Sequence, residues 1–148
     1  MKKLLFALFL ILGGAGMCFG QDKMTDEEFA SQYAVADDLG KMNLFVEYLN
    51  QSLEEGGPIT AVWVDDENKC VVMAMPMDTE SLSAMKEFPE VAKLSIKKEM
   101  FDDPDADLND FLRLVGNNGY GYDIFLMDKA DENNNMIIEF EASELQAL

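Results

Sequence analysis

Three methionines, Met73, Met75 and Met77, alternate along a β-rich stretch, and their spacing is the feature of this chain that most suggests chemistry. Alternate residues of a strand lie on one face of a sheet, so their thioethers could form a soft ligand set for Cu(I), which needs no deprotonation. Flexible methionines also fill irregular cores, and Val71 on the same face favours packing. We expect core packing and keep Met-based Cu(I) binding as an alternative function.

Histidine is absent from the 148 residues, and Arg113 is the only arginine. The lack of histidine excludes Ser-His-Asp and Cys-His catalysis, His-ligated zinc or copper, and the usual near-neutral proton carrier. Cys70 could be a nucleophile or pair with another chain, but it begins an apolar strand and has no histidine to act as its base. We therefore expect a buried thiol, assign no catalytic residue, and expect no cofactor and no enzyme.

Acidic side chains offer two weak candidates for calcium. Oxygen-bearing residues alternate as in the first half of a calcium loop at Asp103, Asp105, Asp107 and Asn109. However, Leu108 and Leu114 occupy the sixth and twelfth places, where an EF-hand needs glycine and glutamate. The sequence excludes an EF-hand and leaves a weaker calcium site open.

Asp128 and Glu139 are also spaced like the ends of a calcium loop, but Ala130 takes a ligand place. A polar hairpin connector explains this segment better. Among 29 acidic residues, chance alone produces close carboxylate pairs, so a carboxylate-dependent hydrolase stays a second alternative function with no pair nominated.

Three aromatic residues, Trp63, Tyr120 and Tyr122, are the candidates for an interaction surface or ligand platform. Packing inside the sheet is the competing explanation for each. The lysines of the long central helix, Lys86 and Lys93 among them, are interpreted as ion-paired with Glu90 on a wet face rather than as a docking surface.

The formal net charge is −18, from 29 acidic and 11 basic residues. Such a chain repels the phosphates of nucleic acid and anionic lipid surfaces, which are bound chiefly through Lys and Arg. We therefore expect no nucleic-acid binding. We expect the negative charge mainly to keep the protein dispersed in solution, and attraction of cations and basic partners is the alternative.

The chain begins like a bacterial export signal. Lys2 and Lys3 precede an apolar run from Leu4 to Leu12, and small residues follow up to Gly20. The run is too short to span a bilayer. We predict a signal peptide over residues 1–20, a single domain over residues 21–148, no integral membrane segment after cleavage, and a periplasmic or secreted location.

Cys18 raises the alternative of a lipid anchor. The residue before it, Met17, is larger than the small residue that a lipoprotein signal carries there. Acylation at Cys18 is therefore the less favoured outcome, and ordinary cleavage after Gly20 is expected.

Apolar spacing and turn residues predict the elements of the remaining chain. Thr25 and Glu28 form a capping box that begins one helix, and a second helix follows from Met42. The other predicted elements are hairpin strands at 59–64 and 70–77, a kinked or two-piece helix with Pro89 over 79–101, a short helix near 107–115, and a second hairpin at 120–127 and 136–141. The first two strands carry apolar residues in both alternating sets, so we expect them to be covered on both faces or central in the sheet.

The predicted fold is α+β, with a four-stranded antiparallel sheet of two hairpins and helices on one face. Loose matches at an offset of about 65 residues suggest a duplicated helix-hairpin unit; for example, Val71-Val72-Met73 matches Met136-Ile137-Ile138. This element order, with the Asp-Pro-Asp segment leading into the last hairpin, resembles small exported proteins of unknown function from Gram-negative bacteria. The resemblance implies a fold type and no catalytic residues. The function we expect is an exported, non-catalytic binding or interaction module for a protein or cell-envelope component.

Overall fold

The structure is a computed structural model, and it describes residues 23–102 and 106–148. The predicted signal peptide, its cleavage point and Cys18 lie outside these residues, as do Asp103 and Asp105. In the described part of the chain, no helix has both the length and the apolar composition needed to cross a membrane.

Four strands form one sheet in the order β1-β2-β3-β4. Their bounds are β1 Ala61–Asp65, β2 Cys70–Met77, β3 Gly121–Asp128 and β4 Asn135–Phe140. The pairs β1-β2 and β3-β4 are antiparallel hairpins, as the sequence predicts. The central pair β2-β3 is parallel, so the prediction of a wholly antiparallel sheet is wrong and the sheet is mixed.

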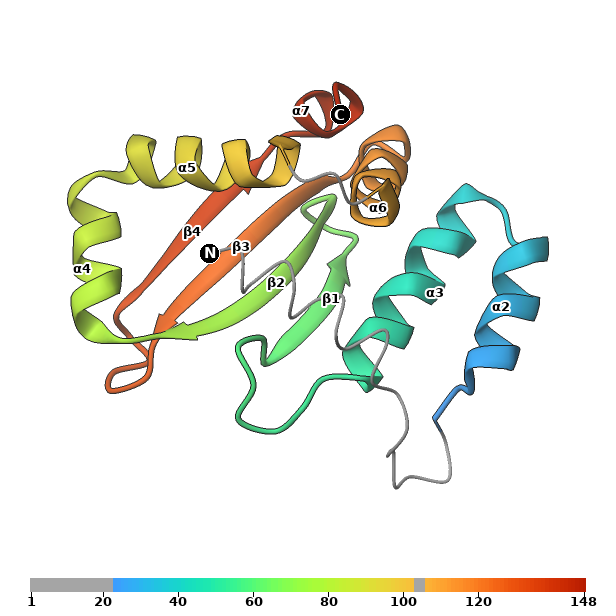
Figure 1. The fold of residues 1–148 in the computed structure, drawn as a ribbon, viewed down its shortest axis with the longest axis horizontal. Coiled ribbons are helices and arrows are strands. Elements are labelled where there is room, and N and C mark those ends of the chain that lie inside the picture. Colours follow the sequence, from blue (N-terminus) through green and yellow to red (C-terminus); the bar gives the residue numbers. More distant parts are fainter. Residues whose placement is uncertain (1–22, 103–105) are drawn as a thin grey trace.

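The parallel pair follows from the connection between its strands. Three helices separate them: α4 Thr79–Glu87, α5 Pro89–Asp102 and α6 Ala106–Asn117. A connection of this kind can carry the chain back to the starting end of the sheet, which a tight turn cannot do. The two-piece form of the predicted helix is confirmed, because α4 ends at Glu87 and α5 begins at Pro89, where the two helices meet at a corner (Figure 1).

Two further helices precede the sheet, α2 Asp26–Val35 and α3 Asp38–Gln51, and α7 Ala142–Gln146 follows it. The predicted capping box is confirmed: the Glu28 amide donates to the Thr25 hydroxyl at 3.2 Å, and the Thr25 amide donates to the Glu28 carboxylate at 2.9 Å. Helix α3 packs against β1, and α2 packs on α3, at the β1 end of the sheet (Figure 1).

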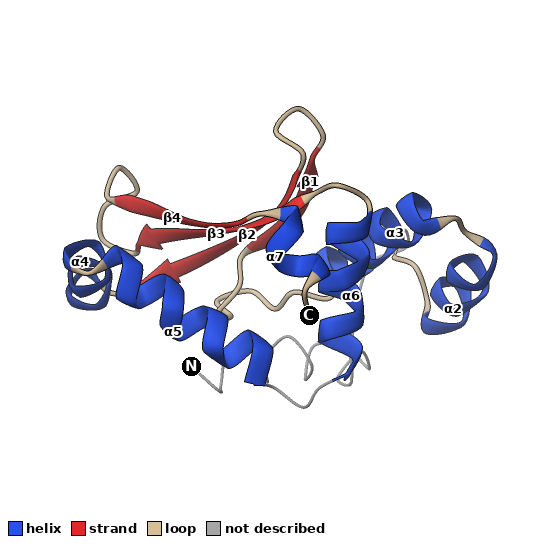
Figure 2. Ribbon diagram, turned by 90° about the horizontal axis from the view of Figure 1, so that it is seen from above, coloured by secondary structure: helices blue, strands red, loops and turns tan. Residues whose placement is uncertain are grey.

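The described helices that pack on the sheet lie on one side of it, and none of them covers its other side (Figure 2). We call these the helix side and the open side. The core is on the helix side and includes Met42, Val71, Leu112, Ile124 and Phe140, each no more than 3% exposed. The predicted placement of helices on one face agrees with this arrangement.

Strand β2 is buried on both sides, as the sequence predicts, but β1 is not. On the open side of β2, Cys70, Val72 and Ala74 are less than 9% exposed, whereas Trp63 of β1 is 41% exposed. Because β1 is also an edge strand, the expectation that it is covered on both faces or central in the sheet is wrong. Because no described helix lies over this side, the small side chains of β2 are shielded by larger neighbours on the adjacent strands.

Both predicted hairpins lie in one sheet, which the duplicated-unit hypothesis requires. The duplication itself stays a prediction.

Candidate functional site

An apolar band crosses the open side of the sheet. The strand register places Trp63 opposite Val72 and Ala74 opposite Phe125, and Phe125 opposite Ile137. We call these five residues the apolar band. Trp63 is 41% and Ile137 is 52% exposed, so the band reaches the surface on β1 and β4. All four strands contribute to it, but Val72 and Ala74 of β2 are less than 9% exposed and Phe125 of β3 is partly buried, so its exposed apolar area lies mainly at Trp63 and Ile137.

A cluster of carboxylates lies beside this band. Asp123 stands opposite Val72 and Glu139 in the neighbouring strands, and Asp65 stands opposite Cys70. Partial burial raises the pKa of Asp123, and the charges of Glu139 and Asp65 raise it further, while a hydrogen bond from Cys70 opposes them. We call Asp65, Asp123 and Glu139 the acidic end of the open side.

A groove of about 1030 Å³ joins the band to the acidic end and extends around the edge strand β4. Its walls include Trp63, Phe125 and Ile137 of the band together with Asp123 and Glu139. Lys69 and Lys93 also line the groove, but carboxylates outnumber them, so the groove offers apolar contact beside a net negative charge.

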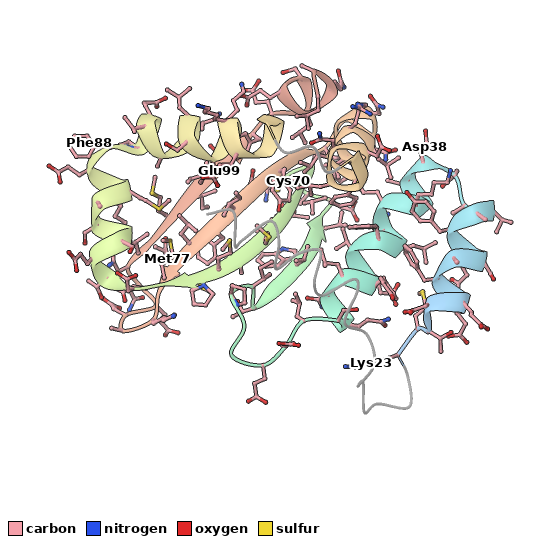
Figure 3. All side chains as sticks on the ribbon, viewed as in Figure 1. Lys23, Asp38, Cys70, Met77, Phe88 and Glu99 are labelled. Atoms are coloured by element: carbon pink, nitrogen blue, oxygen red, sulfur yellow. The ribbon has the colours of Figure 1, made fainter. Side chains whose placement is uncertain are left out.

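Cys70, labelled in Figure 3, begins β2 opposite Asp65, within the acidic end, and it is 5% exposed. Burial raises the pKa of its thiol to about 12, with further contributions from the hydrogen bond to Asp123 and from nearby carboxylate charges. A thiol in this state stays protonated at neutral pH and is a poor nucleophile.

Of the three aromatic candidates for an interaction surface, only Trp63 lies on the exposed surface. Tyr120 is 4% and Tyr122 is 6% exposed. The Tyr120 hydroxyl donates to Asp66 at 2.6 Å and accepts a bond from Lys69 at 3.2 Å, so this ring holds the β1-β2 turn against the start of β3. Tyr122 points into the core on the helix side.

The three methionines of the Cu(I) hypothesis lie together on the helix side of β2. They line a cavity of about 510 Å³ between the sheet and helices α4, α5 and α6, and Met85 of α4 joins them there. The Tyr122 hydroxyl donates a hydrogen bond to the Met73 sulfur at 3.2 Å. Met73 and Met75 are buried, as the packing interpretation expects, and Cu(I) binding stays a prediction.

Asp128 is a buried carboxylate that organises the β3-β4 turn. It accepts hydrogen bonds from the Thr79 hydroxyl at 2.9 Å, the Ala130 amide at 2.8 Å and the Asn134 side chain at 2.9 Å. These bonds, led by that of Ala130, lower its pKa. The arrangement suits the predicted hairpin connector.

The central lysines are paired differently from the prediction. Lys93 and Lys97 of α5 form ion pairs with Glu144 of α7, at 3.2 Å and 2.8 Å, whereas Lys86 bonds Asn134. The predicted partner, Glu90, takes no part in the ion pairs between described residues. The correction follows from topology, because α7 follows β4 and brings Glu144 to the side of α5, a contact that sequence spacing along one helix cannot reveal.

Residues 23–102 and 106–148 contain no group of three or more Cys, Asp or Glu side chains arranged to hold a metal ion. No protein family model, no curated protein and no solved structure matches this chain. The geometry of the open side and of the cavity is therefore the basis for a functional assignment.

Sequence reasoning missed Phe125 and Ile137 as members of an exposed surface. The alternation along each strand places Phe125 with Asp123 on one face and Ile137 with Glu139 on one face. It does not say which face the helices cover, and it does not bring either residue next to Trp63. The register between strands supplies both facts.

Proposed function

We propose that this protein is an exported, non-catalytic binding module that contacts a protein partner through the open side of its sheet. The observation that carries the proposal is the apolar band, which spans four strands and has no described helix over it. One face of an antiparallel or mixed sheet commonly faces water, but that face is then mainly polar. A contiguous exposed apolar surface with a polar rim is typical of a protein contact site.

The negative charge beside the apolar band favours a partner segment that carries basic side chains. The acidic end lies beside the band, and the whole chain has a net charge of −18. Complementary charge at the rim steers encounter and selects partners. We therefore infer that the partner inserts apolar side chains over Trp63 and Ile137 and places Lys or Arg opposite Asp123 and Glu139. Anionic lipid is a poorer match for this surface.

The export signal that the sequence predicts supports a partner outside the cytoplasm, in the periplasm or the cell envelope. Met-based Cu(I) binding and carboxylate-dependent hydrolysis stay as alternatives from the sequence. The duplicated helix-hairpin unit likewise stays a proposal about how the fold arose.

The test compares capture of envelope proteins by the immobilised protein and by two double variants. Trp63→Ser with Ile137→Ser removes the exposed apolar groups of the band. Val91→Ser with Leu94→Ser is the matched control, because these α5 residues are 59% and 63% exposed and equally apolar. We expect the unchanged protein and the control to retain the same partner, and salt to release it. The amount retained by the band variant should be at least about tenfold lower.

Equal retention by all three proteins would contradict the proposal, and so would loss of the partner with the α5 variant alone. Circular dichroism and thermal unfolding of each variant establish that the comparison is made between folded proteins.

A further inference from the structure

The cavity on the helix side has the dimensions and the wall chemistry of a ligand site. Its volume of about 510 Å³ falls within the range of about 300–1,000 Å³ that small-molecule sites occupy. We call it the methionine cavity, because Met73, Met75, Met77 and Met85 all line it. Helices α4 and α5, which meet at a corner (Figure 1), contribute Met85 and Ile96 to its lining, on the opposite side of the sheet from the apolar band.

The inner wall of the methionine cavity is hydrocarbon and thioether. Its other apolar residues include Ile96 of α5, Leu112 of α6 and Ile124 of β3, each less than 9% exposed. The Tyr122 hydroxyl, the polar group set in this wall, donates to the Met73 sulfur and so presents no free donor. Unbranched methionines adapt to ligands of irregular shape, so the wall favours a flexible apolar molecule over a rigid polar one.

The charged and hydroxyl side chains that line the cavity, Asp78, Ser81, Glu99 and Lys129, are each partly or fully exposed, so we take them as its mouth (Figure 3 labels Glu99). The Ser81 amide and hydroxyl donate to the Asp78 carboxylate at 2.8 Å and 2.7 Å, which commits these two residues to the start of α4. Two carboxylates against one ammonium make the mouth anionic, in a chain of net charge −18. An anionic head group is therefore disfavoured at this entrance.

We propose that the methionine cavity binds a neutral, hydrocarbon-rich small molecule, with its apolar body against the methionines and its neutral polar end at the mouth. This inference is independent of the partner surface proposed above, because it concerns the other side of the sheet. The bound molecule would replace water at an apolar wall and bury the exposed part of Met77 and Met85.

The probe is the neutral fluorophore N-phenyl-1-naphthylamine, titrated into the purified protein, with the anionic fluorophore 1-anilinonaphthalene-8-sulfonate as its comparison. We expect saturable enhancement with the neutral probe and at least about tenfold weaker binding of the anionic one. Met85→Trp, which fills the cavity from α4, should weaken binding of the neutral probe at least about tenfold. Ser83→Trp, at an exposed position of the same helix, should leave binding unchanged.

The band variant, Trp63→Ser with Ile137→Ser, should also bind the neutral probe normally, which separates this site from the open side. If Met85→Trp fails to fold, Ser81→Phe at the mouth replaces it. The proposal is overturned if the folded protein does not bind the neutral probe, if the cavity-filling variant binds it as well as the unchanged protein, if the band variant abolishes binding, or if both fluorophores bind equally.

Discussion

The Tyr122 hydroxyl donates a hydrogen bond to the sulfur of Met73 across the two central strands, at 3.2 Å. Both residues are buried, and both lie in the wall of the methionine cavity. This contact joins β2 to β3 at the parallel pair, which is the part of the sheet that the sequence did not predict. The same hydrogen bond occupies the sulfur of Met73, which is one of the three thioethers of the Cu(I) hypothesis.

Tyr122→Phe should cost only about 0.5–1 kcal/mol of unfolding free energy, because thioether sulfur is a weak acceptor and the ring still fills its place. Tyr122→Ala should cost about 3–5 kcal/mol, because it removes the ring from the core. Urea unfolding measures both. A loss above about 2 kcal/mol for Tyr122→Phe would show that the hydroxyl contributes more than this contact explains.

Glu144 should make the stability of the protein depend on pH. Partial burial raises its pKa, but the bonds from Lys97, the Glu141 backbone and Lys93 outweigh burial and lower it from 4.5 to about 2. A depressed pKa stabilises the fold above about pH 4.5, and this contribution is lost as pH falls toward 2. Because both lysines are about one-third exposed, we expect about 1 kcal/mol rather than the full shift.

Glu144→Gln should therefore lower the unfolding free energy by about 1 kcal/mol at pH 7 and by progressively less below pH 4.5. Glu55→Gln, at an exposed loop position, removes the same charge without an ion pair among the described residues and serves as the control. Chemical unfolding across this pH range is the measurement. A difference that stays constant down to pH 2 would contradict the role of the carboxylate charge.

Cys70 should resist thiol reagents in the folded protein. Burial and the neighbouring carboxylates raise its pKa to about 12, so its reaction with a disulfide reagent at pH 8 should be about a hundredfold slower in the native state than in urea. Asp123→Asn removes the bonded carboxylate and should speed the native reaction. Equal rates in the native and unfolded states would show an accessible thiol and contradict the buried placement.

Local patterns predicted the elements well because each depends on nearby residues. The capping box at Thr25, the helix break before Pro89 and the two hairpins all follow from short-range spacing and turn chemistry. The pairing of β2 with β3 does not, because the direction of the central pair depends on how three helices return the chain. A hairpin pattern has the same sequence whether its neighbour runs parallel or antiparallel.

The candidate sites were predictable only in part for the same reason. Alternation placed Met73, Met75 and Met77 on one face, and the structure shows that this face lines a cavity. Alternation also grouped Tyr122 apart from Phe125, but only the position of the helices decides that Tyr122 is buried and that Phe125 belongs to the open side. The residue type of Trp63 was enough to predict it as an interaction candidate, whereas the pairing of the strands was needed to find Phe125 and Ile137 on the same side of the sheet.

Site-specific photo-crosslinking tests the proposed partner surface most directly. A photoreactive amino acid replaces Ile137 in the apolar band or, in the control, Leu94 on α5, and the protein is irradiated in its native envelope. We expect one defined protein adduct from position 137, with a yield that falls in salt and with Trp63→Ser, and no adduct of that mass from position 94. The same adduct from position 94, or no adduct from position 137 in a folded protein, would contradict it.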